Sequence, residues 1–364
     1  MGSMFKDRLE VSIFGESHGK AIGVTIGGLP AGAEVREDII KRELDKRRAG
    51  GTIGDTKRGE RDEYEILSGV KGGKTTGSPL TAVFYNKTAR SGDYENTAFL
   101  PRPSHSDYAA YVKYHGYNDQ NGGGHFSGRL TAPLVFAGAL CEGLLCTKGI
   151  VGGAAIRRIG KETAPGFETQ ENLEKTIEQM NHRAFPCLDP AAEERMKEQI
   201  EAAVKGGDSV GGVAEICVIG LPVGLGEPML ESVESQIAAL VYSVPGVKGL
   251  EFGAGFALGE MRGSEANDNF YMEGDRVKTK TNRSGGINGG LTNGMPLIFR
   301  AAMRPTPSIF QPQETVDLVS GQDAVLKIKG RHDGCILRRG IHGIKAAAMI
   351  ALTNLMLKSG WEWQ

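Results

Sequence analysis

The sequence lacks the features that mark several large classes of protein. Its 43 basic and 44 acidic side chains give a formal net charge of −1, without the basic excess of nucleic-acid-binding and membrane-surface proteins. Its five cysteines form no CxxC pair and no cluster with histidines, which argues against a metal site and a disulfide framework. Its most apolar segment, residues 346–357, is too short to cross a bilayer and is expected in a core or an interface. We therefore expect a cytoplasmic protein without nucleic-acid, membrane or metal partners.

Glycine, by contrast, is abundant, with 53 residues, or about twice its usual ~7% share. The glycines form short clusters such as Gly122-Gly123-Gly124, without a collagen period or a flexible glycine–serine run. Such clusters suit tight turns and the walls of a ligand site. The N-terminus has no signal-peptide pattern, and Met1-Gly2-Ser3 before Met4 is typical of an expression remnant.

Hydrophobic periodicity predicts strands and helices along the whole chain. Apolar or alternating runs predict strands at residues 11–14, 23–26, 80–85, 214–219 and 296–300. Apolar stripes predict helices at residues 36–48, 129–146, 189–204 and 230–241, the third with Asp189 as its N-cap. No linker rich in proline or serine divides the chain, so we expect one compact α+β domain over residues 5–364.

A faint internal repeat suggests that this domain has two related halves. Gly28-Leu29-Pro30 follows one predicted strand, and Gly220-Leu221-Pro222 follows another. After a helix, Gly69-Val70-Lys71-Gly72 occurs in the first half and Gly246-Val247-Lys248-Gly249 in the second. The shared order predicts two similar β–α units, although chance matching in a glycine-rich chain is the alternative.

Two histidines lie where they can reach a cleft. His18 follows a predicted strand and is framed by glycines, and its imidazole titrates near neutral pH. His105 lies between Arg102, which suits an anion, and Asp107, which suits the orientation of an imidazole. Each segment alone also fits an ordinary polar loop.

Phosphate recognition is suggested by two further segments. The Gly122 run leads toward a predicted helix, whose N-terminal N–H groups would cradle an anion. Residues 304–308 and 330–339 combine arginines, small hydroxyls, a histidine and Asp333, although Arg338 also fits a solvated basic face. The residues alone therefore predict an enzyme acting on a small phosphorylated anion, and they leave the reaction open.

Taken in order, these segments resemble the chorismate synthase family from about Phe5 to the last predicted helix. The resemblance rests on residues 15–30, 44–48, 66–70, the His105 turn, the Gly122 run, and residues 220–228, 247–249 and 330–333. It implies a β–α–β sandwich of two similar halves, a homotetramer and a reduced FMN at each active site. The implied reaction converts 5-enolpyruvylshikimate 3-phosphate to chorismate and phosphate by 1,4-elimination, the last common step of the shikimate pathway to aromatic amino acids.

The resemblance also implies roles for individual residues. His18 would protonate the departing phosphate, His105 would set the protonation of the flavin, and Asp333 would assist removal of the ring proton through a flavin nitrogen. Contacts with FMN are implied for His125, Phe126, Ser127, Pro245, Gly246, Gly289, Arg304, Pro305, Thr306, Pro307, Ser308 and Arg331. Contacts with substrate, or with a nicotinamide dinucleotide in the case of Arg47, are implied for Arg47, Arg48, Arg129 and Arg339.

Three positions depart from the family pattern. His125-Phe126-Ser127 stands where the family usually has Arg-Ser-Ser, so an imidazole replaces a guanidinium. Gly334 replaces a proline, which is expected to loosen the turn after Asp333, and Lys345 stands where a glutamate is usual. We interpret the chain as a divergent branch that keeps both catalytic histidines and the aspartate.

Two other functions are alternatives to this interpretation. A flavin reductase that oxidises NADPH would need a nicotinamide pocket, and the sequence has no dinucleotide fingerprint. A non-catalytic protein that binds a phosphorylated metabolite would not need His18, His105 and Asp333 together. The source of reduced FMN, whether NADPH used by this chain or a separate flavin reductase, is left open.

Overall fold

The computed structural model of the protein describes residues 3–48, 62–86, 99–328 and 333–360. Two antiparallel sheets of five strands each form its framework. The first has the order β1 (Met4–Lys6), β2 (Glu10–Gly15), β3 (Ala21–Gly27), β7 (Leu80–Tyr85), β4 (Glu65–Ser68). The second has the order β11 (Val247–Phe252), β16 (Leu297–Met303), β10 (Gly212–Ile219), β8 (Val151–Ile159), β9 (Glu162–Thr163).

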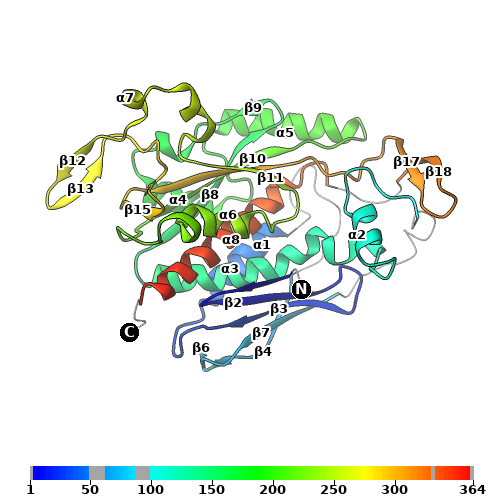
Figure 1. Ribbon diagram of the computed structural model, residues 1–364, viewed down its shortest axis with the longest axis horizontal. Coiled ribbons are helices and arrows are strands. Elements are labelled where there is room, and N and C mark those ends of the chain that lie inside the picture. The colour runs from blue at the N-terminus through cyan, green and yellow to red at the C-terminus, as the bar shows by residue number, and fades with distance from the viewer. Residues whose placement is uncertain (1–2, 49–61, 87–98, 329–332, 361–364) are drawn as a thin grey trace.

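A layer of helices separates the two sheets (Figure 1). It contains α1 (Glu37–Arg47), α3 (Thr131–Cys146), α6 (Val233–Val241) and α8 (Leu337–Lys358). Beyond the second sheet lie α4 (Leu173–His182) and α5 (Pro190–Lys205). The expected α+β fold, a β–α–β sandwich, is confirmed, and the predicted strands and helices all form.

Strand β10 shows how the sequence sets these layers. Side chains alternate between the two faces of a strand. Ala214, Ile216 and Val218 therefore enter the large core that contains α3 and α8. Cys217, between them, faces Ile177 of α4 in a smaller core on the other side of the sheet. A strand that is apolar on both faces, with Glu215 as its one charged residue, thus fits a sheet covered by helices on both sides.

The two halves share one topology. The first half runs β2–β3–α1–β4–β7–α3, and its strands pair in the order β2-β3-β7-β4. The second half runs β8–β10–α6–β11–β16–α8, with α4 and α5 inserted, and its strands pair in the equivalent order β8-β10-β16-β11. The expected similarity of the halves is confirmed.

Gly28-Leu29-Pro30 and Gly220-Leu221-Pro222 occupy equivalent places in this repeat. Gly28 has φ +79° and Gly220 φ +84°. A Cβ on either glycine would lie 2.2 Å from a backbone oxygen, that of Arg8 or of Gly149. Both turns therefore need glycine, because any other residue would be strained and would clash with the backbone just before β2 or β8.

The second pair of matching segments is a coincidence. Gly69 follows β4, whereas Gly246 precedes β11, so the two tetrapeptides are not equivalent. The true counterpart of the hairpin β5–β6 (Val70–Lys71, Lys74–Thr75) is the hairpin β14–β15 (Ile287–Asn288, Leu291–Thr292). Thr75 Oγ1 donates to the Pro30 carbonyl at 2.5 Å, and Thr292 Oγ1 donates to the Pro222 carbonyl at the same distance. This contact is the same in both halves, whereas most of the surrounding sequence differs.

Two helical segments, Gly128–Cys146 and Leu337–Lys358, are long and apolar enough to cross a membrane. Their most apolar windows are 89% and 94% buried inside the protein, so both are core helices. The last helix begins nine residues before the predicted apolar segment 346–357, which places that segment in the core and not at an interface.

Lys345, the residue where the family usually has glutamate, is an ammonium enclosed by this core. Its Nζ lies 3.2 Å from Glu43 of α1, 2.9 Å from Glu142 of α3 and 3.1 Å from Asn181 Oδ1 of α4. Burial alone would raise the pKa of Glu43, but Lys345 and Lys46 outweigh it and hold this pKa well below its usual range. The departure is therefore matched by two buried carboxylates.

We predict that Lys345→Met destabilises the protein by about 3 kcal/mol, because the two buried carboxylates lose the ammonium between them and keep only the cations of Arg42 and Lys46 among the described residues. Chemical denaturation would measure the change. Lys205→Met is the matched control, since Lys205 is 80% exposed and forms a surface ion pair with Glu201. This variant should change stability by no more than about 0.5 kcal/mol. Equal losses in the two variants would contradict the prediction.

Candidate active site

A cavity of about 960 Å³ opens between the two halves and gathers most of the predicted site residues. Its lining includes His18, Arg47, Arg48, His105, His125, Phe126, Ser127, Arg129, Pro245, Gly246, Arg304, Thr306, Pro307, Ser308, Asp333 and Arg339. Gly289, in the β14–β15 hairpin, and Pro305 do not line it. Arg331 lies outside the described residues.

His18 is held just beyond β2 by a serine and a glycine. Ser17 Oγ donates to the Asn121 carbonyl at 3.2 Å and lies 3.0 Å from His18 Nδ1. Because this hydroxyl has one hydrogen, it accepts from Nδ1 when it donates to Asn121. A Cβ on Gly122 would lie 2.0 Å from His18 Cε1, so no other residue leaves room for the imidazole.

The glycine run packs against the imidazoles of His18 and His105. It does not form the phosphate-binding helix N-terminus that the sequence predicted. Gly122, Gly123 and Gly124 all have positive φ and lie in η3 (Asn121–Phe126). A second short turn, η4 (Gly128–Leu130), separates the run from α3, so its N–H groups do not form the α3 N-terminus. Gly123 lies against His105: a Cβ on Gly123 would be 3.5 Å from His105 Cε1.

His105 is held by the aspartate that the sequence suggested. Its Nδ1 lies 2.6 Å from Asp107 Oδ1. Arg102 was expected to suit an anion, but it bonds Asp107 instead, through Nε at 2.7 Å and Nη2 at 2.8 Å. Burial alone would raise the pKa of Asp107, but the bonds from Arg102 and His105 outweigh it and hold this pKa below its ordinary range.

Arg47 is one of the least exposed side chains of the protein, at 1%. Its Nη1 lies 2.5 Å from Asp62, its Nε donates to Thr131 Oγ1 at 2.9 Å and its Nη2 to the Gly128 carbonyl at 3.1 Å. Burial lowers the pKa of Arg47 to about 10, and Asp62 opposes this shift. The guanidinium is thus engaged at every nitrogen by the protein itself.

Asp62 was missed by sequence reasoning. Its carboxylate bridges Arg47 and Arg129 and lines the cavity. Burial would raise its pKa, but the two guanidiniums outweigh this and lower it. Asp62 stands in a dense run of charged residues between positions 57 and 65, so no local pattern distinguished it.

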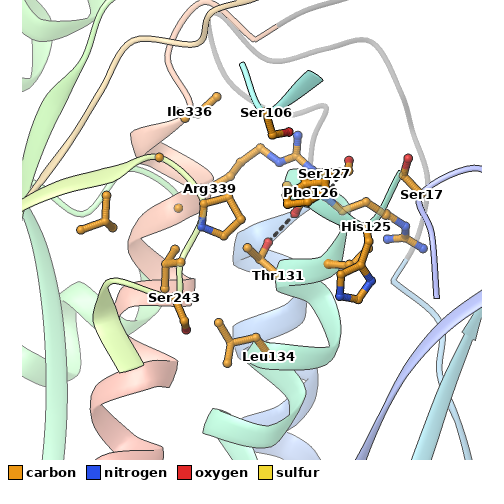
Figure 2. Close-up of a pocket in the computed structure, with 18 of the residues that line it drawn as sticks. Ser17, Ser106, His125, Phe126, Ser127, Thr131, Leu134, Ser243, Ile336 and Arg339 are labelled. Carbon is orange, nitrogen blue, oxygen red and sulfur yellow. Dashed lines mark hydrogen bonds between the residues drawn. The ribbon is translucent and has the colours of Figure 1, made fainter. Parts of the chain in front are cut away.

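Arg339 and Asp333 form a second ion pair in the cavity, with Arg339 Nη1 2.9 Å from Asp333 Oδ2. The Arg339 backbone lies at the start of α8, and Figure 2 shows its side chain beside the same cavity as Phe126 and Ser127. At Gly334, where the sequence suggested a looser turn, a Cβ would lie 2.3 Å from Val204 Cγ2, and the Gly334 carbonyl accepts from Val210 N at 2.8 Å. Arg338 is buried, not on a solvated face.

His125, which replaces the expected arginine, bridges two segments near the cavity. Its Nδ1 donates to the Gly15 carbonyl at 2.7 Å, and its Nε2 bonds the hydroxyl of Ser3, within the segment interpreted as an expression remnant. The neighbouring Phe126 ring is 38% exposed. Both side chains line the cavity, but both ring nitrogens of His125 are bonded to the protein, so Phe126 is the more accessible of the two (Figure 2).

The two predicted flavin turns of the second half lie side by side. Arg304 N donates to the Gly246 carbonyl at 2.9 Å. Arg304 Nη1 donates to the Ser104 carbonyl at 2.5 Å, which ties this turn to the His105 segment. The cavity wall is thus continuous from the first half to the second.

Comparison with known proteins agrees with this geometry. The family model for chorismate synthase matches residues 9–357. The chorismate synthase of Thermococcus gammatolerans is 47% identical over 358 residues, covering 97% of this chain and 98% of the relative. That of Dehalococcoides mccartyi is 42% identical over 360 residues, covering 99% of this chain and 97% of the relative.

A solved structure is also similar. A crystal structure of chorismate synthase superposes with a TM-score of 0.75 at 27% identity, covering 96% of this chain and 92% of the other. This chain belongs to the chorismate synthase family of lyases, enzymes of aromatic biosynthesis.

Proposed function

We propose that the protein converts 5-enolpyruvylshikimate 3-phosphate to chorismate and phosphate with reduced FMN as cofactor. The observation that carries the proposal is the meeting of His18, His105 and Asp333 with several guanidiniums around one cavity. A 1,4-elimination breaks a C–O bond to phosphate and removes a ring proton. The site must therefore offer cations and a proton to the leaving phosphate, and an acceptor to the ring proton.

The described residues fit a flavin. The cavity of about 960 Å³ is at the upper end of the size of ligand sites and has room for a cofactor and a small substrate. An exposed aromatic ring at Phe126 and the hydroxyls of Thr306 and Ser308 suit an isoalloxazine and its polar edges. Reduced FMN, when bound, would lend an electron to the substrate and regain it at the end.

His18 is the proposed acid for the departing phosphate. With Nδ1 directed to Ser17, its Nε2 is the nitrogen that would deliver a proton. Arg129 and Arg339 are the guanidiniums proposed to hold the phosphate and carboxylates, with Arg48 beside them in the lining. Asp333, paired with Arg339, is the proposed acceptor of the ring proton, and His105 is the proposed proton donor at the flavin side.

The family resemblance implies a ligand contact for Arg47, and we propose that Arg47 acts on the ligand only indirectly. Its nitrogens are already bonded to Asp62, Thr131 and the Gly128 carbonyl, so its contribution would be to hold Asp62 and through it Arg129. A nicotinamide dinucleotide would find no exposed guanidinium there. Reduction of FMN by NADPH on this chain has therefore no support at this position, and a separate reductase is the simpler source.

We expect reduced FMN and 5-enolpyruvylshikimate 3-phosphate to yield chorismate and phosphate in equal amounts, measured anaerobically after reduction of FMN with dithionite. Oxidised FMN should support little turnover, because it has no electron to lend. Equal rates with both forms would refute the cofactor role. Oxidation of NADPH by FMN and the protein, without substrate, would favour a reductase instead.

The histidines should separate into two classes. His18→Ala and His105→Ala should each lower turnover by ~10²–10⁴-fold while FMN binding is largely kept, because a proton carrier acts in the transition state. His125→Ala should mainly weaken FMN or substrate binding, because the cavity wall next to Phe126 would lose the bond to the Gly15 carbonyl. Steady-state kinetics with FMN titrations would measure this, with exposed His182→Ala as control. Wild-type turnover in both His18→Ala and His105→Ala would disprove the catalytic roles.

We propose that the protein is a homotetramer in the cytoplasm. All five cysteines are free thiols, which suits a reducing compartment. The hairpin of β12 (Phe270–Glu273) and β13 (Arg276–Thr279) leaves Phe270 and Met272 68% and 63% exposed, as expected of surface covered by another copy.

Light scattering should give a particle of about four chains, as the family resemblance implies. Met272→Lys should weaken the assembly if this hairpin is covered, whereas Val204→Lys, at a partly exposed site on α5, should not. A monodisperse monomer of the unaltered protein at micromolar concentration would contradict the tetramer.

A further inference from the structure

We infer that Asp107, clamped by Arg102, is a positioning residue that fixes the ring tautomer of His105 and stabilises its charged form. The inference rests on the proposed function only in assigning His105 to proton transfer. Neither Asp107 nor Arg102 was assigned a role in that function.

The direction of the hydrogen bond follows from the chemistry of its two atoms. His105 Nδ1 and Asp107 Oδ1 are 2.6 Å apart. An ionised carboxylate has no hydrogen to give, so Nδ1 must donate. The neutral ring is then protonated at Nδ1, and Nε2 is the nitrogen that gains and loses a proton. His105 Nε2 lies next to Gly123, 3.6 Å from the position that a Cβ on Gly123 would occupy.

Arg102 keeps the carboxylate in the orientation that His105 needs. Its side chain meets both carboxylate oxygens, and its backbone N donates to Asp107 Oδ2 at 3.0 Å. A bidentate guanidinium leaves the carboxylate little rotational freedom. Between them, Ser104 adopts φ +61°, and Arg304 bonds its carbonyl. The turn is therefore held on both sides of His105, by Arg304 at Ser104 and by Arg102 at Asp107.

The charged groups around His105 determine how substitution of Asp107 or Arg102 would affect its imidazolium. In the described part of the chain they are Arg102 and Asp107 on its own turn, Arg304 on the neighbouring turn and His18 across Gly122 and Gly123. Asp107 is the only anion among these four. Removing it should disfavour the imidazolium. Removing Arg102 should favour the imidazolium, because the Asp107 carboxylate would lose the guanidinium that offsets its negative charge.

A purely structural role makes a different prediction. If Arg102 and Asp107 only stabilise the turn, both substitutions should loosen it and change activity in the same direction. Opposite effects of the two substitutions are the signature of electrostatic positioning.

The test uses Asp107→Asn and Arg102→Gln, with Asp189→Asn as matched control. Asp189 also lies at a helix start, where it accepts from Ala191 N, but on α5 outside the cavity. Nitrogen-15 NMR of the histidine rings in the FMN-free protein, with His105→Gln for assignment, reports the tautomer without relying on turnover. Circular dichroism confirms that each variant folds.

We expect Asp107→Asn to abolish the preference for a proton on Nδ1 of His105, and Asp189→Asn to leave it unchanged. In the full assay, the alkaline fall in turnover should move to lower pH for Asp107→Asn, by about one pH unit or more. For Arg102→Gln it should move to higher pH. Turnover of Asp107→Asn at neutral pH should fall about 10²-fold.

An unchanged tautomer in Asp107→Asn, or shifts of equal sign in the two variants, would overturn the inference. If Asp107→Asn does not fold, the direction of the Arg102→Gln shift decides. A changed tautomer with unchanged turnover would keep Asp107 as the residue that orients the ring and would instead remove His105 from the proposed reaction.

Discussion

The docking of α8 against α1 through buried charge is the constraint on which the cavity depends. Lys345 cannot lie in the core without Glu43 and Glu142, and its bonds to them fix how α8 lies against α1 and α3. About two helical turns earlier, the same helix presents Arg339, whose Nε donates to the Arg47 carbonyl at 3.2 Å. The helix that carries the buried ammonium of Lys345 therefore also brings Arg339 of the second half next to Arg47 of the first.

Within the cavity the arginines have two kinds of task. Arg47 and Arg102 are engaged by the protein, the first by Asp62 and the second by Asp107. Arg129 and Arg339 are each held by one carboxylate, that of Asp62 and that of Asp333. All four arginines line the cavity. An arginine that is held by one carboxylate is pre-oriented for a second anion, which lowers the entropy lost when a ligand binds.

The two imidazoles share one glycine floor but have different partners. His18 meets a neutral hydroxyl, whereas His105 meets a carboxylate. A carboxylate favours the imidazolium more than a hydroxyl does. Two histidines side by side can therefore carry different proton-transfer tasks at one pH, which suits a reaction that needs a proton delivered at two places.

The sequence by itself determined the elements, the layered fold and most of the proposed site residues that line the cavity. Apolar periodicity and turn chemistry are local, and the family motifs mark His18, His105 and Asp333. Tertiary structure decided the rest. It engaged every nitrogen of Arg47 with the protein, brought Asp62 between two guanidiniums, and made the β5–β6 hairpin equivalent to β14–β15. These outcomes depend on contacts between residues far apart in the chain, and the energy of a buried charge depends on partners that no local pattern reveals.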